Sequence, residues 1–516
     1  MKFTSILNDV IGPIMRGPSS SHTAGAYYIG KTISCFLTDR PVRIECIFDP
    51  DNSMGATYIQ LGVDYAFAAG ILKWNMLDNR YFKVFNFLKN EDIKIEYKLT
   101  RIIEDNHPNA MKIIIHFKDN DSIIIYARAI GGGGLLIQKI NTWTVEIDGK
   151  QNSLLIRSDK KHVKKIIEIL TKYKEVNYKI RESKSEKEIL FEIGASVSIL
   201  KLLIKDINKK CKDTKLWEIE SVFYSKKGLR IFESIQDIIN IAEEKKLSLG
   251  QISLIYEMEL LGLEKKLIIK EMENRLSVMI KSVFDGFRNR NVKMKLSEPY
   301  AGTLMKSVKN NKVFLGNINT RAAIRAISAM HISNSMGVVC AAPTGGSAGV
   351  LPGVLVTLSE EYKLDKRTII MAMFAAGGIG VLFLDLATFA AEKAGCQVEI
   401  GAAGAMAAAA IIEVAGGSAK KALDAAAISL QNTMGLVCDP VHGRCELPCQ
   451  TRNGVAASNA FVCADIILAG YNNPIPLNET IVSSYETGRT LPYELRCTIK
   501  GGIAITPSAL AIKELR

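Results

Sequence analysis

The chain has 516 residues, of which 48% are hydrophobic and 23% are charged. This balance is typical of a folded globular protein and excludes global disorder, and the length favours two to four domains. The net charge of +13 comes from lysine-rich stretches with acids between them. We interpret it as a solvated surface and predict no nucleic-acid partner, because no recognition motif accompanies it.

The first 148 residues mix strand-like runs with helical stretches, which predicts an α/β domain. The expected strands cover 42–48, 112–117 and 122–126. Two polar or glycine-rich loops interrupt these elements: GPSSSHTAG at 17–25, before an expected helix, and IGGGG at 130–134, after an expected strand.

Residues 149–222 alternate in the order βαββαβ, which is the ferredoxin-like arrangement. Residues 223–233 are expected to link this segment to the rest of the chain. From 234 to 516 the periodicity is helical, and small residues dominate after 320, which predicts a tightly packed all-α domain. The expected fold class is therefore α+β with several domains.

The most apolar stretch of the chain covers 369–384. It is short and broken by glycines, which favours a buried core helix over a membrane span. The first 18 residues lack the apolar region of a signal peptide. We therefore expect a cytoplasmic protein without a membrane partner, in which the ten cysteines are reduced thiols or metal ligands.

Three cysteines of the last third have glycine or proline close by: Cys396, Cys438 and Cys449. Thiolates are the usual ligands of iron–sulfur clusters, and three of them on a cubane leave one iron open as a Lewis acid. The alternative interpretation is buried free thiols, since cysteine is among the most buried residue types. Cys340 and Cys445 are further candidates that spacing does not exclude.

The loop 17–25 offers hydroxyl and backbone N–H groups at a helix start, which suits a carboxylate or a phosphate. A helix cap without a ligand is the alternative. The loop 342–349 is of the same type, but it has neither the lysine of a Walker A loop nor the spacing of a Rossmann fingerprint. His22 and His107 lie in loops and are candidate bases near neutral pH.

Taken together, several phrases resemble the iron–sulfur-dependent L-serine dehydratases over nearly the whole chain. They are Ile11-Gly12-Pro13, GPSSSHTAG (17–25), APTGGSAGV (342–350), GCQ (395–397), GLVCDPV (435–441) and PCQTRN (448–453). The resemblance assigns 1–148 to the β part of the family, 234–516 to its α part and 149–222 to its ACT domain. It implies a [4Fe–4S] cluster and no pyridoxal phosphate.

The activity that the resemblance implies is β-elimination of water from L-serine, giving pyruvate and ammonia. In the family an open iron binds the substrate hydroxyl while a base removes the α-proton. The implied cluster ligands are Cys396, Cys438 and Cys449, and the catalytic candidates are His107 and His22. The implied substrate-binding residues are Ser19, Ser20, Ser21, Thr23, Thr344, Gly345, Gly346, Ser347, Arg452 and Asn453. The expected partners are a small amino-acid substrate and a second copy of the chain in a homodimer.

At several positions the sequence departs from the family pattern. Leu61 and Val63 replace a histidine and a threonine, Ala129 replaces a serine, and Leu386 opens an apolar run where polar residues are usual. These changes leave two alternatives open: a lyase acting on a different β-substituted amino or hydroxy acid, and a non-catalytic iron–sulfur sensor. Cys497 stands where a glutamate is usual, and from its position we hypothesise an additional ligand of the resting cluster.

The ACT-like segment also departs from the family, because it lacks the glycine turn that binds regulatory amino acids. It has Asp159-Lys160-Lys161-His162 instead. We therefore expect a structural or oligomer-forming module.

Overall fold

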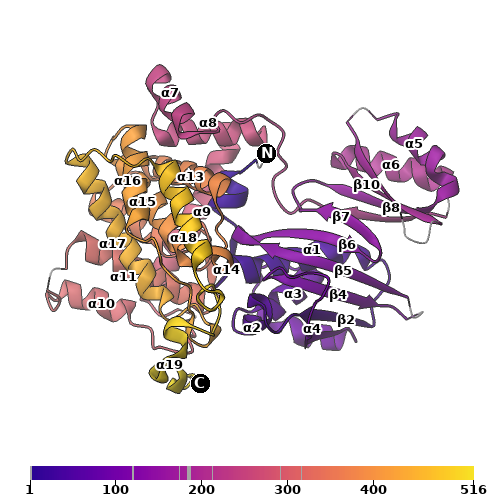
Figure 1. Ribbon diagram of the computed structural model, residues 1–516, viewed down its shortest axis with the longest axis horizontal. Coiled ribbons are helices and arrows are strands. Elements are labelled where there is room, and N and C mark those ends of the chain that lie inside the picture. The colour runs from indigo at the N-terminus through magenta and orange to yellow at the C-terminus, as the bar shows by residue number, and fades with distance from the viewer. Residues whose placement is uncertain are drawn as a thin grey trace.

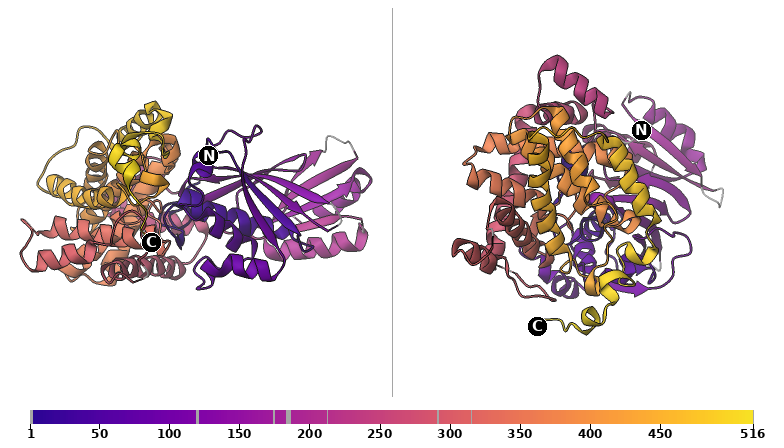
Figure 2. Two further views of the ribbon diagram at one scale, coloured as in Figure 1. Left: turned by 90° about the horizontal axis from the view of Figure 1, so that it is seen from below. Right: turned by 60° about the vertical axis from the view of Figure 1, so that its left-hand side comes forward.

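The computed structural model describes residues 3–118, 121–173, 175–182, 187–211, 213–290, 292–314 and 316–515. It has a helical half, which carries the C-terminus, and a half with two β-sheets (Figure 1). The two halves lie side by side along the longest axis (Figure 2). The predicted mixed α+β class is confirmed.

The larger sheet is built from the first third of the chain. In spatial order its strands are β3 (Lys94–Leu99), β2 (Arg43–Phe48), β4 (Ala110–His116), β5 (Ser122–Ile130), β6 (Gly134–Ile140) and β7 (Trp143–Ile147). β2 and β3 are parallel, and the other neighbours are antiparallel. Buried and exposed residues alternate along β7, because only one face of this strand meets the core. The accompanying helices are α1 (Gly25–Ile33), α2 (Ser53–Thr57), α3 (Val63–Ile71) and α4 (Val84–Asn90).

The smaller sheet has the order β11-β8-β10-β9, and all its neighbouring strands are antiparallel. Its helices join the strands in the sequence βαββαβ. The elements are β8 (Ser153–Asp159), α5 (Val163–Leu170), β9 (Asn177–Glu182), β10 (Glu188–Gly194), α6 (Val197–Lys210) and β11 (Lys215–Ile219). Their apolar faces form a separate small core.

Helices dominate the chain after residue 234. They are α7 (Ile235–Lys245), α8 (Leu249–Leu261), α9 (Lys265–Phe287), α10 (Ala301–Lys309), α11 (Ile318–Asn334), α12 (Val350–Glu361), α13 (Lys366–Leu386), α14 (Ala391–Ala394), α15 (Ile400–Val414), α16 (Ala419–Gln431), α17 (Cys449–Leu468), α18 (Leu477–Thr490) and α19 (Pro507–Ala511). Two helices, α13 and the segment Cys396–Val414, are long and apolar enough to cross a membrane, and 78% and 83% of their apolar windows are buried inside the structure. The burial of α13 agrees with the prediction that 369–384 forms a core helix.

The beginning of the chain packs in the helical half, although the sequence assigned it to the α/β domain. A π-helical turn, η1 (Ile6–Val10), lies on α13, where a Cβ on Gly380 would approach a methyl carbon of Val10 to 2.1 Å. The buried Glu257 accepts hydrogen bonds from the Ser5 hydroxyl (2.6 Å) and from the Ile6 N–H (2.8 Å). Apolar side chains of η1 fit this face because α13 presents glycine there.

The prediction that 234–516 is entirely helical is wrong at one place. A short strand, β12 (Val338–Cys340), pairs antiparallel with β1 (Ile14–Arg16). Its valines favour an extended backbone, and the pairing satisfies backbone groups of the chain where it leaves η1. This two-stranded ribbon leads directly to the loops 17–25 and 342–349.

Candidate metal centre

The three predicted thiols meet in the helical half, close to its contact with the α/β half. Cys396 begins the short turn η7 (Cys396–Val398), Cys449 is the first residue of α17, and Cys438 lies in an extended segment that bridges to Arg496. All three are at most 5% exposed. The sulfurs of Cys396 and Cys438 and a carboxylate oxygen of Glu399 lie within 4.8 Å of one another.

Two further cysteines join this group. The Cys445 side chain contacts Cys449, and the Cys497 side chain contacts Cys438. The Cys497 N–H also donates to the Cys438 carbonyl (2.8 Å), and Cys497 has a left-handed backbone with φ 60°. A non-glycine residue in that region is uncommon and concentrates at functional sites.

Cys340, the other candidate, lies elsewhere. It belongs to β12 and is buried in the apolar core of the helical half. Burial raises the pKa of Cys340 to about 12, so this thiol stays protonated at neutral pH. It therefore matches the interpretation as a structural thiol.

The charges around the thiols favour thiolate at one of them. The contact with Cys445 lowers the pKa of Cys449, and the nearby Arg452 guanidinium adds to this effect. Thiolate is the form of cysteine that binds metals. In contrast, burial raises the pKa of Glu399 to about 8, and the negative groups Glu392 and Cys449 contribute in the same direction.

Arg452 and Asn453 follow Cys449 in the first turn of α17. The Arg452 Nη1 donates to Val437 O and is 2.9 Å from the Asp439 carboxylate. The Asn453 amide donates to Cys449 O (2.8 Å) and to Gly346 O (2.9 Å), and its oxygen accepts from the Gly349 N–H (3.1 Å). Asn453 thus ties Cys449 to the loop 342–349, and its polar atoms are occupied by backbone groups.

The loop 342–349 lies between the thiols and the loop 17–25. The hydroxyls of Thr344 and Ser347 are 3.0 Å apart. A Cβ on Gly345 would lie 2.8 Å from Pro18 O, and a Cβ on Gly346 would lie 3.5 Å from the Glu399 carboxylate. The two glycines therefore allow the loop to approach both neighbours.

The loop 17–25 contains a single π-helical turn, η2 (Ser20–Ala24), with His22 at its centre. The His22 Nδ1 lies 3.0 Å from the hydroxyls of Ser19 and Ser21. Its Nε2 lies 3.1 Å from the hydroxyl of Ser53, which donates to Cys497 O (3.1 Å). Burial lowers the pKa of His22 to about 4, so the imidazole is neutral at neutral pH.

The other two predicted hydroxyls of this loop differ from each other. The Thr23 hydroxyl donates to Leu61 O (2.7 Å), which fixes η2 on the α/β half. The Ser20 hydroxyl is buried and has no hydrogen-bond partner among the described residues. A buried polar atom without a partner is uncommon and indicates a place for a ligand or water.

His107 lies at the same contact between the halves. Its Nδ1 accepts a hydrogen bond from the Asn109 N–H (3.1 Å), and the Asn109 amide donates to the buried Glu392 (2.7 Å). Burial lowers the pKa of His107 to about 4, and the positive charges of Lys393 and Arg128 act in the same direction. The Asn109 Oδ1 is a second buried atom without a partner in the described part of the chain.

The apolar replacements noted in the sequence are not all near the thiols. Leu61, Val63 and Ala129 are buried in the core of the α/β half, and Ala129 meets Gly25 just after η2. Leu386 is 41% exposed at the end of α13. Three of the replacements thus lie in the wall that supports η2, and the fourth lies on the surface.

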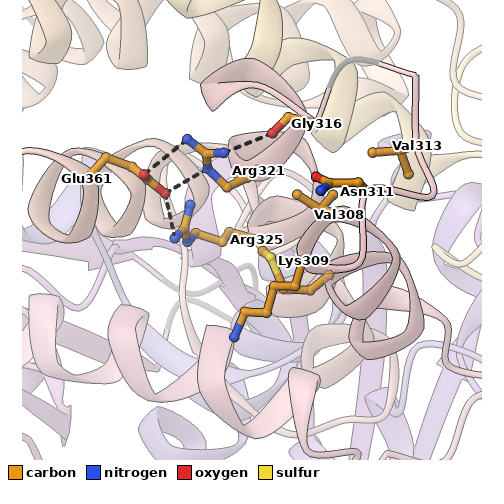
Figure 3. A pocket seen from close by; sticks show the side chains of 9 residues that line it. Val308, Lys309, Asn311, Val313, Gly316, Arg321, Arg325 and Glu361 are labelled. Atoms are coloured by element: carbon orange, nitrogen blue, oxygen red, sulfur yellow. Dashed lines mark hydrogen bonds and ion pairs between the residues drawn. The ribbon is translucent and has the colours of Figure 1, made fainter.

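A polar cavity of about 440 Å³ lies apart from this group, lined by residues of α10, α11 and α12 (Figure 3). Arg321 makes a bidentate contact with Glu361 (2.8 and 3.0 Å), and Arg325 contacts the same carboxylate. Because these charges are paired and the described lining contains no thiol, this cavity is distinct from the candidate metal centre.

Sequence reasoning missed Glu399, Ser53 and the pair formed by Asn109 and Glu392. Glu399 follows Cys396 by three residues, so a helical turn at that point would have placed both side chains on one side. Ser53 and Asn109 have no comparable signal, because only the fold brings them to the loops of the other half.

A family model described as "Serine dehydratase alpha chain" matches residues 165–504. The chain belongs to this family. The family predicted from the motifs is therefore confirmed, and the match extends from the smaller sheet through the helical half, leaving residues 1–164 outside it.

Curated relatives match between a third and about half of the chain. The probable L-serine dehydratase alpha chain of Bacillus subtilis (strain 168) is 37% identical over 284 residues, which are 55% of this chain and 95% of that protein. The L-serine dehydratase alpha chain of Peptoniphilus asaccharolyticus is 34% identical over 275 residues, or 53% and 94%. L-serine dehydratase 1 of Escherichia coli (strain K12) is 37% identical over 171 residues, or 33% and 38%.

Proposed function

We propose that this protein is a [4Fe–4S]-dependent L-serine ammonia-lyase, which eliminates water from L-serine and yields pyruvate and ammonia. The observation that carries the proposal is that Cys396, Cys438 and Cys449 lie close together and that the loop 342–349 connects them to the hydroxyl-rich loop 17–25. Its relatives are named L-serine dehydratases. L-serine, a small amino acid, is thus the proposed substrate.

The donor set fits an iron–sulfur cluster. Cys396, Cys438 and Cys449 would hold it, since all three are buried and lie beside turns whose backbone can approach sulfur. When bound, an iron with an open coordination site supplies a Lewis acid that makes hydroxide a better leaving group. Arg452, close to Cys396 and Cys449, offsets part of the negative charge of the thiolates.

His22 is the proposed proton acceptor. The Ser53 hydroxyl donates its hydrogen to Cys497 O, so the His22 Nε2 must donate to Ser53 and Nδ1 carries the lone pair. The acceptor nitrogen therefore faces the hydroxyls of Ser19 and Ser21. A substrate α-proton would reach His22 through one of these hydroxyls, as in other serine–histidine pairs.

His107 is suited to the opposite role. Its Nδ1 accepts the Asn109 N–H, so the neutral ring carries its proton on Nε2 and donates there. We propose that it donates to the leaving hydroxyl or the substrate carboxylate. The hydroxyls of Ser20 and Thr344 and the backbone of the loops 17–25 and 342–349 would hold the carboxylate by hydrogen bonds.

The three-domain division also belongs to this proposal. The segment 1–148 would supply the polar loop and both histidines, 234–516 would supply the cluster, and 149–222 would serve as a structural module. We further propose that the protein acts as a homodimer in the cytoplasm.

The test is anaerobic reconstitution with iron and sulfide, followed by assays of pyruvate and ammonia with L-serine. Turnover should give the two products in equal amounts and should vanish in Cys438→Ser. Cys463→Ser is the matched control, because Cys463 is a fully buried thiol of α17 whose sulfur contacts Asn432, Asn459 and Ser429 and none of the proposed ligands among the described residues. Full iron content without turnover would contradict the proposal and favour a different substrate or a sensor.

A further inference from the structure

Glu399 is an acidic side chain that neither the proposed ligand set nor the proposed proton transfers use. Its carboxylate lies over Gly346, contacts the Thr344 hydroxyl and is within 4.8 Å of the sulfurs of Cys396 and Cys438. It therefore lies between the thiols and the loop 342–349, where the proposed function places the substrate.

No positive side chain pairs with this carboxylate in the described part of the chain. Arg452, which lies near Cys396 and Cys449, forms its ion pair with Asp439 instead. Glu392 and Cys449 add negative potential at Glu399. With its pKa raised to about 8, the Glu399 carboxyl group is largely protonated at neutral pH, and a cation that binds beside it would stabilise the carboxylate form.

Two buried polar atoms near this place favour a polar ligand. The hydroxyl of Ser20 and the Oδ1 of Asn109, at 1% and 0% exposure of their residues, have no hydrogen-bond partner among the residues that the structure describes. Ser20 N lies 3.0 Å from the position of a Cβ on Gly345, next to Gly346. Asn109 donates with its other amide atom to Glu392.

The position of Glu399 beside two cysteine sulfurs is also compatible with a role as a metal ligand. Soft iron sites prefer thiolate to carboxylate, and the chain places two additional thiols, Cys445 and Cys497, in contact with the proposed ligands. Further ligands are therefore available without Glu399, which leaves its charge for a cation.

We propose that Glu399 binds the α-ammonium group of the substrate and thereby selects amino acids over acids that lack the amine. This inference rests on the proposed function, because it places the amino acid between the thiols and the loop 17–25. The neutral donors of that loop take the carboxylate, and Glu399 takes the opposite charge. A zwitterion then matches the site at both ends.

The test compares L-alanine with propionate, two unreactive compounds that differ only by the amine. Their affinities for the iron-loaded protein are measured anaerobically by calorimetry, in parallel with iron and sulfide content. Because loss of one partner of a buried charge pair costs at least about 2 kcal/mol, or about 30-fold in affinity, the wild type should prefer L-alanine by at least that factor. Glu399→Gln should abolish the preference and keep its iron.

Glu413→Gln is the matched control, because Glu413 is a largely buried carboxylate bonded to a serine hydroxyl and a backbone N–H far along α15. It should keep the preference. Glu399→Asp retains the charge but withdraws it by one methylene, and it should lower the preference; this variant decides the matter if Glu399→Gln does not fold.

Three results would overturn the inference: an unchanged preference in both Glu399 variants, equal weakening of both compounds, or loss of iron in Glu399→Gln, which would make Glu399 a ligand. The proposed reaction fails separately. If the wild type prefers L-alanine but forms no pyruvate from L-serine, the reaction is wrong and the ammonium site stands.

Discussion

The helical half and the α/β half contribute to the candidate site in different ways. In the helical half the reactive groups sit at helix ends and turns that the surrounding helices bury, as Cys449 does at the start of α17. In the α/β half they sit on one π-helical turn, η2, and on loops joined to it by hydrogen bonds. The first arrangement fixes positions by packing, and the second fixes them by a polar network.

The two halves also differ in how much of them the family model matches. The match covers the helical half but leaves out residues 1–164, and the apolar replacements at Leu61, Val63 and Ala129 lie in that part. Under the proposed function, the helical half would hold the cluster and the α/β half would adapt to the substrate. Substitutions in the two halves should therefore have different signatures.

The largest effect is expected for the helical half. Cys396→Ser should abolish iron retention and turnover together, because a buried hydroxyl does not replace a thiolate ligand. Cys445→Ser should keep most of its iron and lose only the effect on the pKa of Cys449. Iron and sulfide content and the visible absorption spectrum distinguish the variants. Full iron in Cys396→Ser would remove this residue from the ligand set.

A smaller effect is expected for the α/β half. His22→Asn should lower turnover about 10²- to 10⁴-fold, the usual contribution of a general base, and leave iron content unchanged. His162→Asn, at the start of a helix in the smaller sheet's domain, serves as the control. If His22→Asn also lost its iron, the two halves would not have separate roles.

The contact between the halves can be tested at one glycine. In Gly345→Ala the new methyl would lie 2.8 Å from Pro18 O and 3.0 Å from Ser20 N, which forces the two loops apart at a cost of about 1–3 kcal/mol. KM for L-serine should rise, and the free energy of unfolding should fall by no more than this amount. Gly416→Ala, which has open space but φ 72°, should reduce the free energy of unfolding by about 1 kcal/mol and leave KM unchanged.

The last prediction concerns acid. Burial lowers the pKa of His331 from its ordinary 6.5 to about 4, so the unfolded chain binds a proton more readily than the folded one. The associated stability is fully present above pH 6.5 and is lost as the pH falls from 6.5 to 4. At pH 5 the loss is about 2 kcal/mol. Chemical denaturation of His331→Gln should show a weaker dependence on pH, and an equal dependence would contradict the assignment.

Much of the candidate site could be predicted because its residues belong to short local sequence motifs. The three cysteines and the loops 17–25 and 342–349 carry distinctive neighbours in the sequence. Glu399, Ser53 and Asn109 act through contacts between distant segments, such as the link from Ser53 to Cys497, and no local pattern encodes such a link. The same limit explains β12, since its pairing with β1 joins segments from opposite ends of the fold.

Likewise, local patterns located the strands and helices of the smaller sheet and three strands of the larger one, but they did not indicate that the beginning of the chain packs in the helical half. The sequence places η1 in the same domain as the residues that follow it. In the structure, however, its side chains Ile6, Leu7 and Val10 are buried in the helical half, and η1 packs against the glycine face of α13. An apolar segment does not specify its partner when several cores are available.

The position of η1 also means that this segment is synthesised long before the residues against which it packs. Ser5 emerges from the ribosome 252 residues before Glu257, to which it is bound in the folded protein. At ordinary rates of translation the delay is roughly 10 to 50 s, and α13 is made later still. During that interval Ile6, Leu7, Val10 and Ile11, all buried in the finished fold, have no partner, so the nascent chain must shield them until the helical half is complete.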